Sequence, residues 1–252
     1  MLKIRVMPTL LFKEVGLVKG VCFDSSRRIG TAMQAVKVYN VREVDELVFL
    51  DIAATDSGRQ PDFETIDDLA DECFMPLTVG GGVQSLEHVR RLLTVGADKV
   101  SLNTAAVENP GLISESAKRF GSQCVVVSID ARKAPNGRYE VFTHSGKQQT
   151  GKEPQHWAQQ AESLGAGEIL LTSVDRDGTM EGYDLELVRR VSAAVRIPVI
   201  ASGGAGNYGH MVSVLKDGGA SAVAAASMFH FTEQTPLEAK RFLKAQGFPV
   251  RC

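Results

Sequence analysis

Two glycine-rich segments have the composition of phosphate-binding turns, TVGGGV at 78–83 and ASGGAG at 201–206. Each follows a short apolar run and precedes an amphipathic segment. Glycines in such a turn let backbone N–H groups face an oxyanion, and the start of the next helix adds a favourable dipole. Either turn alone is a weak signal, because tight turns between strand and helix also need glycine. The two turns together predict two anion pockets.

Polar residues that follow other apolar runs complete these pockets. Asp177, in the segment SVDRDGT, is placed to hold a substrate hydroxyl, with loop capping as the alternative. Two facing pockets predict an elongated substrate with a phosphate at each end, whereas a purely structural role of the glycines is the alternative. The predicted substrate-binding residues are Gly81, Gly82, Asn103, Thr104, Thr172, Asp177, Gly203, Gly204, Ala226 and Ser227.

Asp130 is the predicted catalytic residue. It ends the apolar run VVVSID, where barrel enzymes place their acids and bases. The matching position at the end of the first apolar run is Leu11. Leucine can neither donate nor accept a proton, so a mechanism with paired carboxylates lacks one of them. Leu11 therefore marks the position of a missing acid.

A second charged set stands at the beginning of the apolar runs rather than at their ends. It consists of Arg5, Glu46, Lys99 and Glu168. The starts of parallel strands meet at the bottom of a barrel, which usually serves stability. Two bases and two acids there predict a ring of salt bridges that closes the bottom, and a purely structural plug is its plainest interpretation.

Eight apolar runs alternate with helical patterns along the chain. The predicted strands are 4–10, 47–51, 77–80, 99–103, 125–130, 169–174, 199–202 and 222–226. Asp62 and Asp184 stand where helix N-caps belong, and Gly96 and Gly218 where C-caps belong. This alternation predicts a single (β/α)8 barrel domain over 1–252, with the doubly wound open sheet as the alternative.

The two halves of the chain match at a fixed offset of 122 residues. Glu46, Asp62, Gly81 and Gly96 correspond in this way to Glu168, Asp184, Gly203 and Gly218. The match runs without a gap for about fifty residues, which predicts two similar half-barrels related by a pseudo-twofold axis. The segment 132–151 departs from this regularity and is longer than a barrel loop needs. A surface hairpin and a lid over the substrate are both open interpretations of it.

Charge and composition exclude several classes of function. The net charge of −2 comes without a block of one sign, so neither nucleic acid nor an anionic membrane is an expected partner. The four cysteines form no CxxC pair, and the five histidines have no ligand spacing. We expect reduced thiols, a cytoplasmic location, no metal and no cofactor. No segment has the length and hydropathy of a membrane span.

Many segments, in their order and spacing, resemble the HisF family of synthase subunits of imidazole glycerol phosphate synthase. They include MLKIRVMPTL, TVGGGV, GADKVSLNTAAVENP, FGSQCVVVSIDA, VFTHSGK, GAGEILLTSVDRDGT and IASGGAG. The resemblance implies a HisH-like glutaminase docked at the barrel bottom, with ammonia passing up the interior to a bisphosphorylated substrate. It makes the ring of Arg5, Glu46, Lys99 and Glu168 an ammonia gate, and places Asp98 and Gln123 near the glutaminase.

The family uses two aspartates in cyclisation, and this chain matches only the one at Asp130. Around Leu11 it reads LLFKEVG, where a family member would show a segment such as LDVKDG. These coordinated changes favour a paralogue that supplies ammonia to an amidotransferase acting on a surface-polysaccharide sugar. The alternatives are an authentic cyclase of histidine biosynthesis, a related barrel isomerase, and a non-catalytic scaffold that activates a glutaminase.

Overall fold

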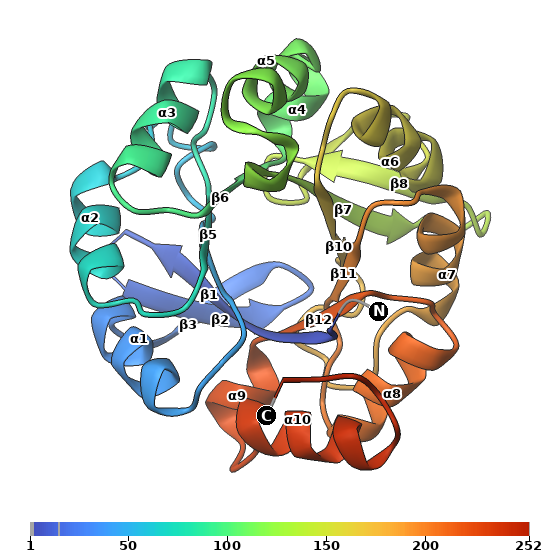
Figure 1. Ribbon diagram of the computed structural model, residues 1–252. Coiled ribbons are helices and arrows are strands. Elements are labelled where there is room, and N and C mark those ends of the chain that lie inside the picture. Colours follow the sequence, from blue (N-terminus) through green and yellow to red (C-terminus); the bar gives the residue numbers. More distant parts are fainter. Residues whose placement is uncertain (1–2, 15, 252) are drawn as a thin grey trace.

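Eight strands pair in parallel around a closed barrel in the computed structural model, which describes residues 3–14 and 16–251 (Figure 1). In barrel order they are β1 (Arg5–Lys13), β4 (Leu47–Asp51), β5 (Leu77–Gly80), β6 (Lys99–Leu102), β7 (Val125–Lys133), β10 (Glu168–Ser173), β11 (Val199–Ser202) and β12 (Ala222–Ala225). Because β12 pairs with β1 and β10 pairs with β7, the sheet has no open edge. The predicted (β/α)8 barrel is confirmed, and the open sheet is wrong.

Helices surround this barrel and cover the outer face of every strand (Figure 1). They are α1 (Ala32–Val41), α2 (Phe63–Asp71), α3 (Leu86–Thr94), α4 (Thr104–Glu108), α5 (Gly111–Phe120), α6 (Pro154–Ser163), α7 (Leu185–Ala194), α8 (Tyr208–Lys216), α9 (Ser227–Phe231) and α10 (Pro236–Ala245), with a 3-10 turn η1 (Ser122–Cys124) before β7. In the described part of the chain, no helix has the length and apolar character needed to cross a bilayer.

Capping residues end these helices largely as the sequence predicts. Asp62 accepts a hydrogen bond from the Thr65 amide, and Asp184 accepts one from the Leu187 amide, so both predicted N-caps are confirmed. Gly96 follows α3 with a φ of 104°. Gly218 follows α8, but it is Gly219 that takes the left-handed conformation there, with a φ of 73°. The prediction for Gly218 is therefore wrong by one residue.

Side chains along each barrel strand point alternately outward, toward the helices, and inward, into the barrel. They form an outer core and a separate interior cluster. One large apolar cluster lies between strands and helices, and a second, smaller one lies inside the barrel. The interior cluster contains Met7, Val48, Val126, Leu170, Ile200, Ala222 and Ala224. Since both faces of each strand are covered, the strands need the aliphatic runs from which they were predicted.

Antiparallel extensions follow the first strand of each half-barrel. β2 (Gly16–Val21) and β3 (Asp24–Gly30) form a hairpin next to β1, which the sequence did not predict. After β7, β8 (Tyr139–Thr143) pairs back onto it and β9 (Gln148–Gln149) pairs with β8. The segment 132–151 is thus a hairpin. Residues 1, 2, 15 and 252, which include Cys252 and parts of MLKIRVMPTL and LLFKEVG, lie outside the described residues.

The pseudo-twofold relationship extends to the short helices at the carboxyl ends of β6 and β12. Both α4 and α9 have five residues. Asn103, before α4, has φ −117° and ψ −89°, and Ala226, before α9, has φ −123° and ψ −69°. Two equivalent turns with the same uncommon backbone place two helix N-termini at the same end of the barrel.

Candidate functional site

A pocket of about 220 Å³ opens at the carboxyl ends of the barrel strands. Residues of every barrel strand except β5 line it, together with residues of both glycine turns, the first of which follows β5. Nine of the ten predicted substrate-binding residues line it, namely Gly81, Asn103, Thr104, Thr172, Asp177, Gly203, Gly204, Ala226 and Ser227. Gly82 does not line the pocket, because it faces the loop that contains Arg59 and Ala54. The sequence therefore located this end of the barrel correctly.

Both glycine turns also have a steric reason for their composition. A Cβ atom on Gly81 would lie 2.2 Å from the carbonyl oxygen of Asp51, and one on Gly204 would lie 2.1 Å from that of Gly182. Their φ angles of 105° and 101° exclude most side chains as well. The glycines are thus needed for close backbone approach, and both Gly81 and Gly204 line the pocket.

Asp130 projects into the pocket from β7. Its Oδ2 accepts a hydrogen bond of 2.8 Å from the side-chain amide of Asn103. Burial and the nearby charge of Asp177 raise the pKa of Asp130 to about 7, although the hydrogen bond from Asn103 acts in the opposite direction. A carboxyl group with this pKa can both donate and accept a proton near neutral pH.

Asp177 is paired with a lysine that the sequence analysis missed. Lys19 lies on β2 and is only 2% exposed, and its Nζ donates to both carboxylate oxygens of Asp177 at 2.8 and 2.9 Å. The hairpin is held in place by the amide of Cys22, which donates to the carbonyl of Asp177 at 2.8 Å. A lysine inside the apolar segment GLVKGV was the available signal, but without the hairpin its direction was unknown.

Leu11 occupies the matching place on β1 and lines the same pocket. It pairs in register with Leu50 of β4, so the wall of the pocket opposite Asp130 is apolar. The nearby Asp51 does not replace the missing acid, because its Oδ1 accepts hydrogen bonds from the amides of Ala53 and Ala54, both at 3.0 Å. The first half-barrel thus contributes no free carboxylate next to Leu11 among the described residues.

The end of the hairpin at 132–151 forms one wall of the pocket. The amide of His144 donates to Thr104 Oγ1 at 3.1 Å, and Ser145 Oγ donates to the carbonyl of Ile52 at 2.8 Å. The ring of Phe23, from the other hairpin, packs so closely against Gly146 that a Cβ there would approach it to 2.8 Å. The two hairpins therefore meet over the mouth of the barrel.

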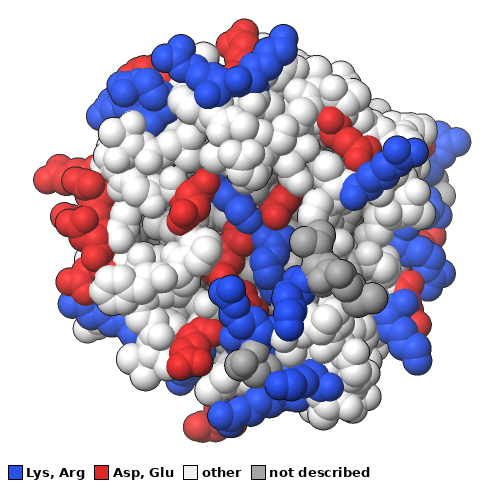
Figure 2. Space-filling model, in the orientation of Figure 1, with Lys and Arg blue, Asp and Glu red and all other residues white. Residues whose placement is uncertain are grey.

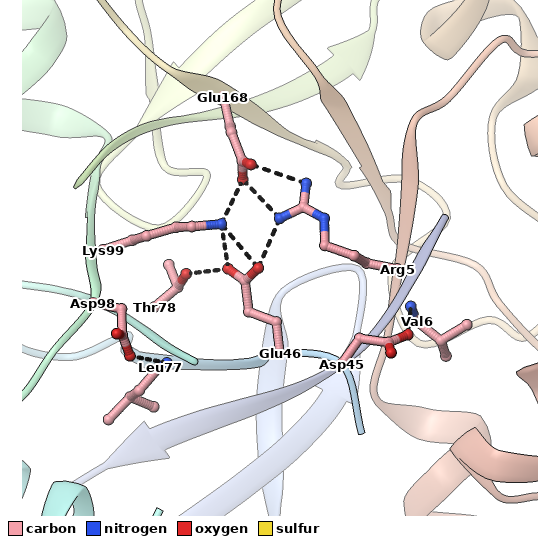
Figure 3. A network of polar contacts seen from close by, with 9 residues as sticks. All are labelled: Arg5, Val6, Asp45, Glu46, Leu77, Thr78, Asp98, Lys99 and Glu168. Atoms are coloured by element: carbon pink, nitrogen blue, oxygen red, sulfur yellow. Dashed lines mark hydrogen bonds and ion pairs between the residues drawn. The ribbon is translucent and has the colours of Figure 1, made fainter. Parts of the chain in front are cut away.

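The opposite end of the barrel is closed by four charged side chains (Figure 3). Glu46, which is only 3% exposed, pairs with Arg5 at 2.7 Å and with Lys99 at 2.8 Å. Glu168 pairs with the same two cations at 3.0 and 3.1 Å, which completes the ring. Burial alone would raise the pKa of Glu46, but the charges of Lys99 and Arg5 outweigh it and lower that pKa below its usual value. The predicted ring of salt bridges is confirmed as a structure.

Two aspartates fix the backbone beneath this ring (Figure 3). Asp45, directly before Glu46, accepts a hydrogen bond from the Val6 amide at 2.9 Å. Asp98, directly before Lys99, accepts one from the Leu77 amide at 2.8 Å. Asp98 and Gln123 are both exposed, so each can also face a partner. Basic and acidic side chains meet near the middle of this face of the molecule (Figure 2).

A comparison with protein families gives these features their context. A family model described as "Histidine biosynthesis protein" matches residues 5–235, nearly the whole chain. The chain belongs to the histidine biosynthesis protein family. The family comprises isomerases and cyclases of histidine biosynthesis that share this barrel. The match covers both ends of the barrel in this member of the family, the pocket with Asp130 and the ring with Glu46.

A buried hydroxyl group also lies in the pocket. Ser227 Oγ, at the first residue of α9, is buried and has no hydrogen-bond partner among the described residues. An unpaired buried hydroxyl costs free energy unless a ligand or water satisfies it. At the start of α9, opposite Thr104 at the start of α4, this hydroxyl is suited to an anionic oxygen.

Proposed function

We propose that this chain is the HisF-type synthase subunit of a glutamine amidotransferase complex. In this proposal a HisH-like glutaminase docks over the ring end and ammonia passes through the barrel to the pocket. The observation that carries it is the pairing of a four-member charged ring at one end with a two-sided polar pocket at the other. Buried ion pairs are poor stabilisers compared with apolar packing, which favours a functional role for the ring.

The pocket supports proton transfer by one acid rather than two. Asp130 has a pKa of about 7, whereas Leu11 lies where the second acid of the cyclase would be. We therefore propose that cyclisation is not the reaction of this chain. Its ammonia would instead reach an amidotransferase partner that modifies a sugar of a surface polysaccharide. Asp98 and Gln123 would contact the glutaminase, and the glycine turns would hold a phosphorylated ligand.

An authentic cyclase is the second candidate. It is favoured by the pocket, where Asp130, the Lys19–Asp177 pair and both glycine turns are all present. A scaffold that only activates a glutaminase would have no need of these residues, which argues against that third candidate.

Ammonium-dependent turnover separates the candidates. The substrate is the bisphosphorylated formimino-ribulosyl aminoimidazole carboxamide nucleotide, and excess ammonium salt replaces the glutaminase. We expect the natural chain to be inactive, the Leu11→Asp variant to gain activity, and the matched Leu11→Asn variant to stay inactive because an amide transfers no proton. Imidazole glycerol phosphate formed by the natural chain at the rate of Leu11→Asp would show that it is a cyclase.

A further inference from the structure

A second pocket, of about 250 Å³, lies along α1 on the outside of the barrel. We call it the α1 groove. One side of it is α1 itself, and the other is formed by Leu17 and Ile29 of the β2–β3 hairpin and by Phe229 and His230 of α9. It shares no lining residue with the pocket at the barrel mouth. The α1 groove is therefore a separate site.

Aliphatic and aromatic carbon lines most of the α1 groove. Leu17 and Phe229 are buried members of the outer core, and Ile29 and Ala35 are partly buried against it. Val38 completes this lining and is 46% exposed, which is uncommon for a large apolar side chain on the outer face of a helix. The α1 groove can therefore accept an apolar body from solvent.

A buried hydroxyl group faces the α1 groove without a protein partner. Tyr39, which lines the groove, is only 3% exposed, and its hydroxyl makes no hydrogen bond to another residue in the described ranges. Burial raises the pKa of Tyr39 above its usual value, so the hydroxyl keeps its proton at neutral pH and can donate it. A buried tyrosine hydroxyl usually has a partner, so this one is suited to a bound ligand.

Arg42 places a positive charge next to this hydroxyl. It lines the groove three residues after Tyr39, where side chains of a helix are neighbours, and its charge acts on the Tyr39 hydroxyl. Within residues 3–14 and 16–251, the Arg42 guanidinium forms no ion pair and no hydrogen bond. A guanidinium matches the two oxygens of a carboxylate in geometry, and a single cation suits a single negative charge.

We propose that the α1 groove binds a small organic carboxylate with an apolar body, whose carboxylate contacts Arg42 and the Tyr39 hydroxyl. The apolar body would lie over Leu17, Ile29 and Val38. The inference goes beyond the proposed function and does not depend on it, because neither a glutaminase nor the pocket at the mouth takes part.

Hexanoate is a suitable probe, and NMR of the full chain with labelled isoleucine methyl groups can follow it. Ile29 lines the α1 groove, whereas Ile52 lines the pocket at the mouth and serves as the internal control. We expect hexanoate to shift the Ile29 methyl signal in a saturable way and to leave that of Ile52 unchanged. Hexan-1-ol, which has the same chain without the charge, should bind about tenfold more weakly.

Variants of α1 test each contact. Arg42→Gln should weaken hexanoate binding about tenfold, and Tyr39→Phe, which removes only the hydroxyl, about fivefold. Val38→Glu should abolish binding, because its carboxylate lies in the groove four residues before Arg42 and competes with the ligand. Val41→Glu is the matched control, since Val41 is 83% exposed and does not line the groove. It should bind hexanoate as the natural chain does.

Three results would overturn the inference. The first is an Ile29 signal that does not move, or that moves only together with Ile52. The second is equal binding of hexanoate by the natural chain, Arg42→Gln and Val38→Glu. The third is a dimer in sedimentation velocity that Val38→Glu dissociates and Val41→Glu does not, because a second copy of the chain would then fill the groove.

Discussion

Asp130 and Leu11 stand at matching places on β7 and β1, and both line the pocket. The protein environment gives Asp130 a pKa of about 7, through burial and the charge of Asp177. At Leu11 the same kind of position is filled by an aliphatic side chain that packs beside Leu50. The two matching strand positions therefore differ in chemistry through a single side chain each: Asp130 can transfer a proton and Leu11 cannot.

Asp130→Asn should stabilise the protein most at alkaline pH. The folded-state pKa of about 7 lies above the usual value of 3.8, so the natural chain loses stability as pH rises between these values. The amide does not ionise, so the gain from Asp130→Asn should grow by about 2–3 kcal/mol between pH 5 and pH 8. Urea unfolding at both pH values measures it. A gain that is equal at the two pH values would contradict the raised pKa.

Lys19→Met should destabilise the fold through the charge that it leaves behind. Lys19 is 2% exposed, and its loss leaves Asp177 without its cation. We expect a cost of about 3 kcal/mol in the natural chain and of about 1 kcal/mol in an Asp177→Asn background. A double-mutant cycle by chemical denaturation tests this. Equal costs in the two backgrounds would mean that the two side chains are not coupled.

At the scale of elements, most of the barrel could be predicted because each strand and helix carries its own signal. Aliphatic runs marked the strands, and Asp62 and Asp184 marked two helix starts. The hairpin of β2 and β3 could not be predicted, since its turn places Cys22 and Phe23 at φ 51° and 68°. Such turns usually contain asparagine or glycine, so the sequence lacked the expected turn residues. For this reason Lys19 was missing from the predicted site, although Asp177 was in it.

Gly204→Ala tests whether the second glycine turn depends on close backbone contact. A Cβ there would lie 2.1 Å from the carbonyl of Gly182, at a φ of 101°, so we expect a loss of roughly 3 kcal/mol. Gly137→Ala is the matched control, because Gly137 also has a positive φ but no atom within 4 Å of the added carbon. It should cost roughly 1 kcal/mol. Thermal unfolding of the two variants compares them, and equal losses would exclude the contact as the cause.

At the scale of the whole molecule, the barrel interior has three layers. A charged ring lies at one end, an apolar layer lies in the middle, and a polar pocket lies at the other end. The ring links residues from β1, β6 and β10 and the residue before β4. The sequence predicted these four residues because all stand near the start of a strand. It could not predict the Asp45 and Asp98 hydrogen bonds to the Val6 and Leu77 amides, since these contacts depend on the register between neighbouring strands.

Lys99→Met should lower the free energy of unfolding at neutral pH, and lower it by less at acidic pH. Lys99 and Arg5 lower the pKa of Glu46, so their contribution is fully present above the usual pKa of 4.5 and is lost as pH falls below it. We expect a cost of about 2–3 kcal/mol at pH 7, decreasing toward pH 4. Arg90→Met, which removes a surface ion pair, should change little at either pH. A cost of Lys99→Met that is constant with pH would assign it to packing.

The matched helices α4 and α9 have a consequence for how this barrel can be studied. Their backbones repeat each other, yet the first strands of the two halves, β7 and β1, present different groups to the pocket, a carboxyl group at Asp130 and a hydrocarbon at Leu11. Each half is thus an internal reference for the other, in the same solvent and at the same temperature. A spectroscopic label placed at Thr104 and then at Ser227 would compare two helix starts of matching backbone within one molecule, and a difference between them would report their different side-chain surroundings.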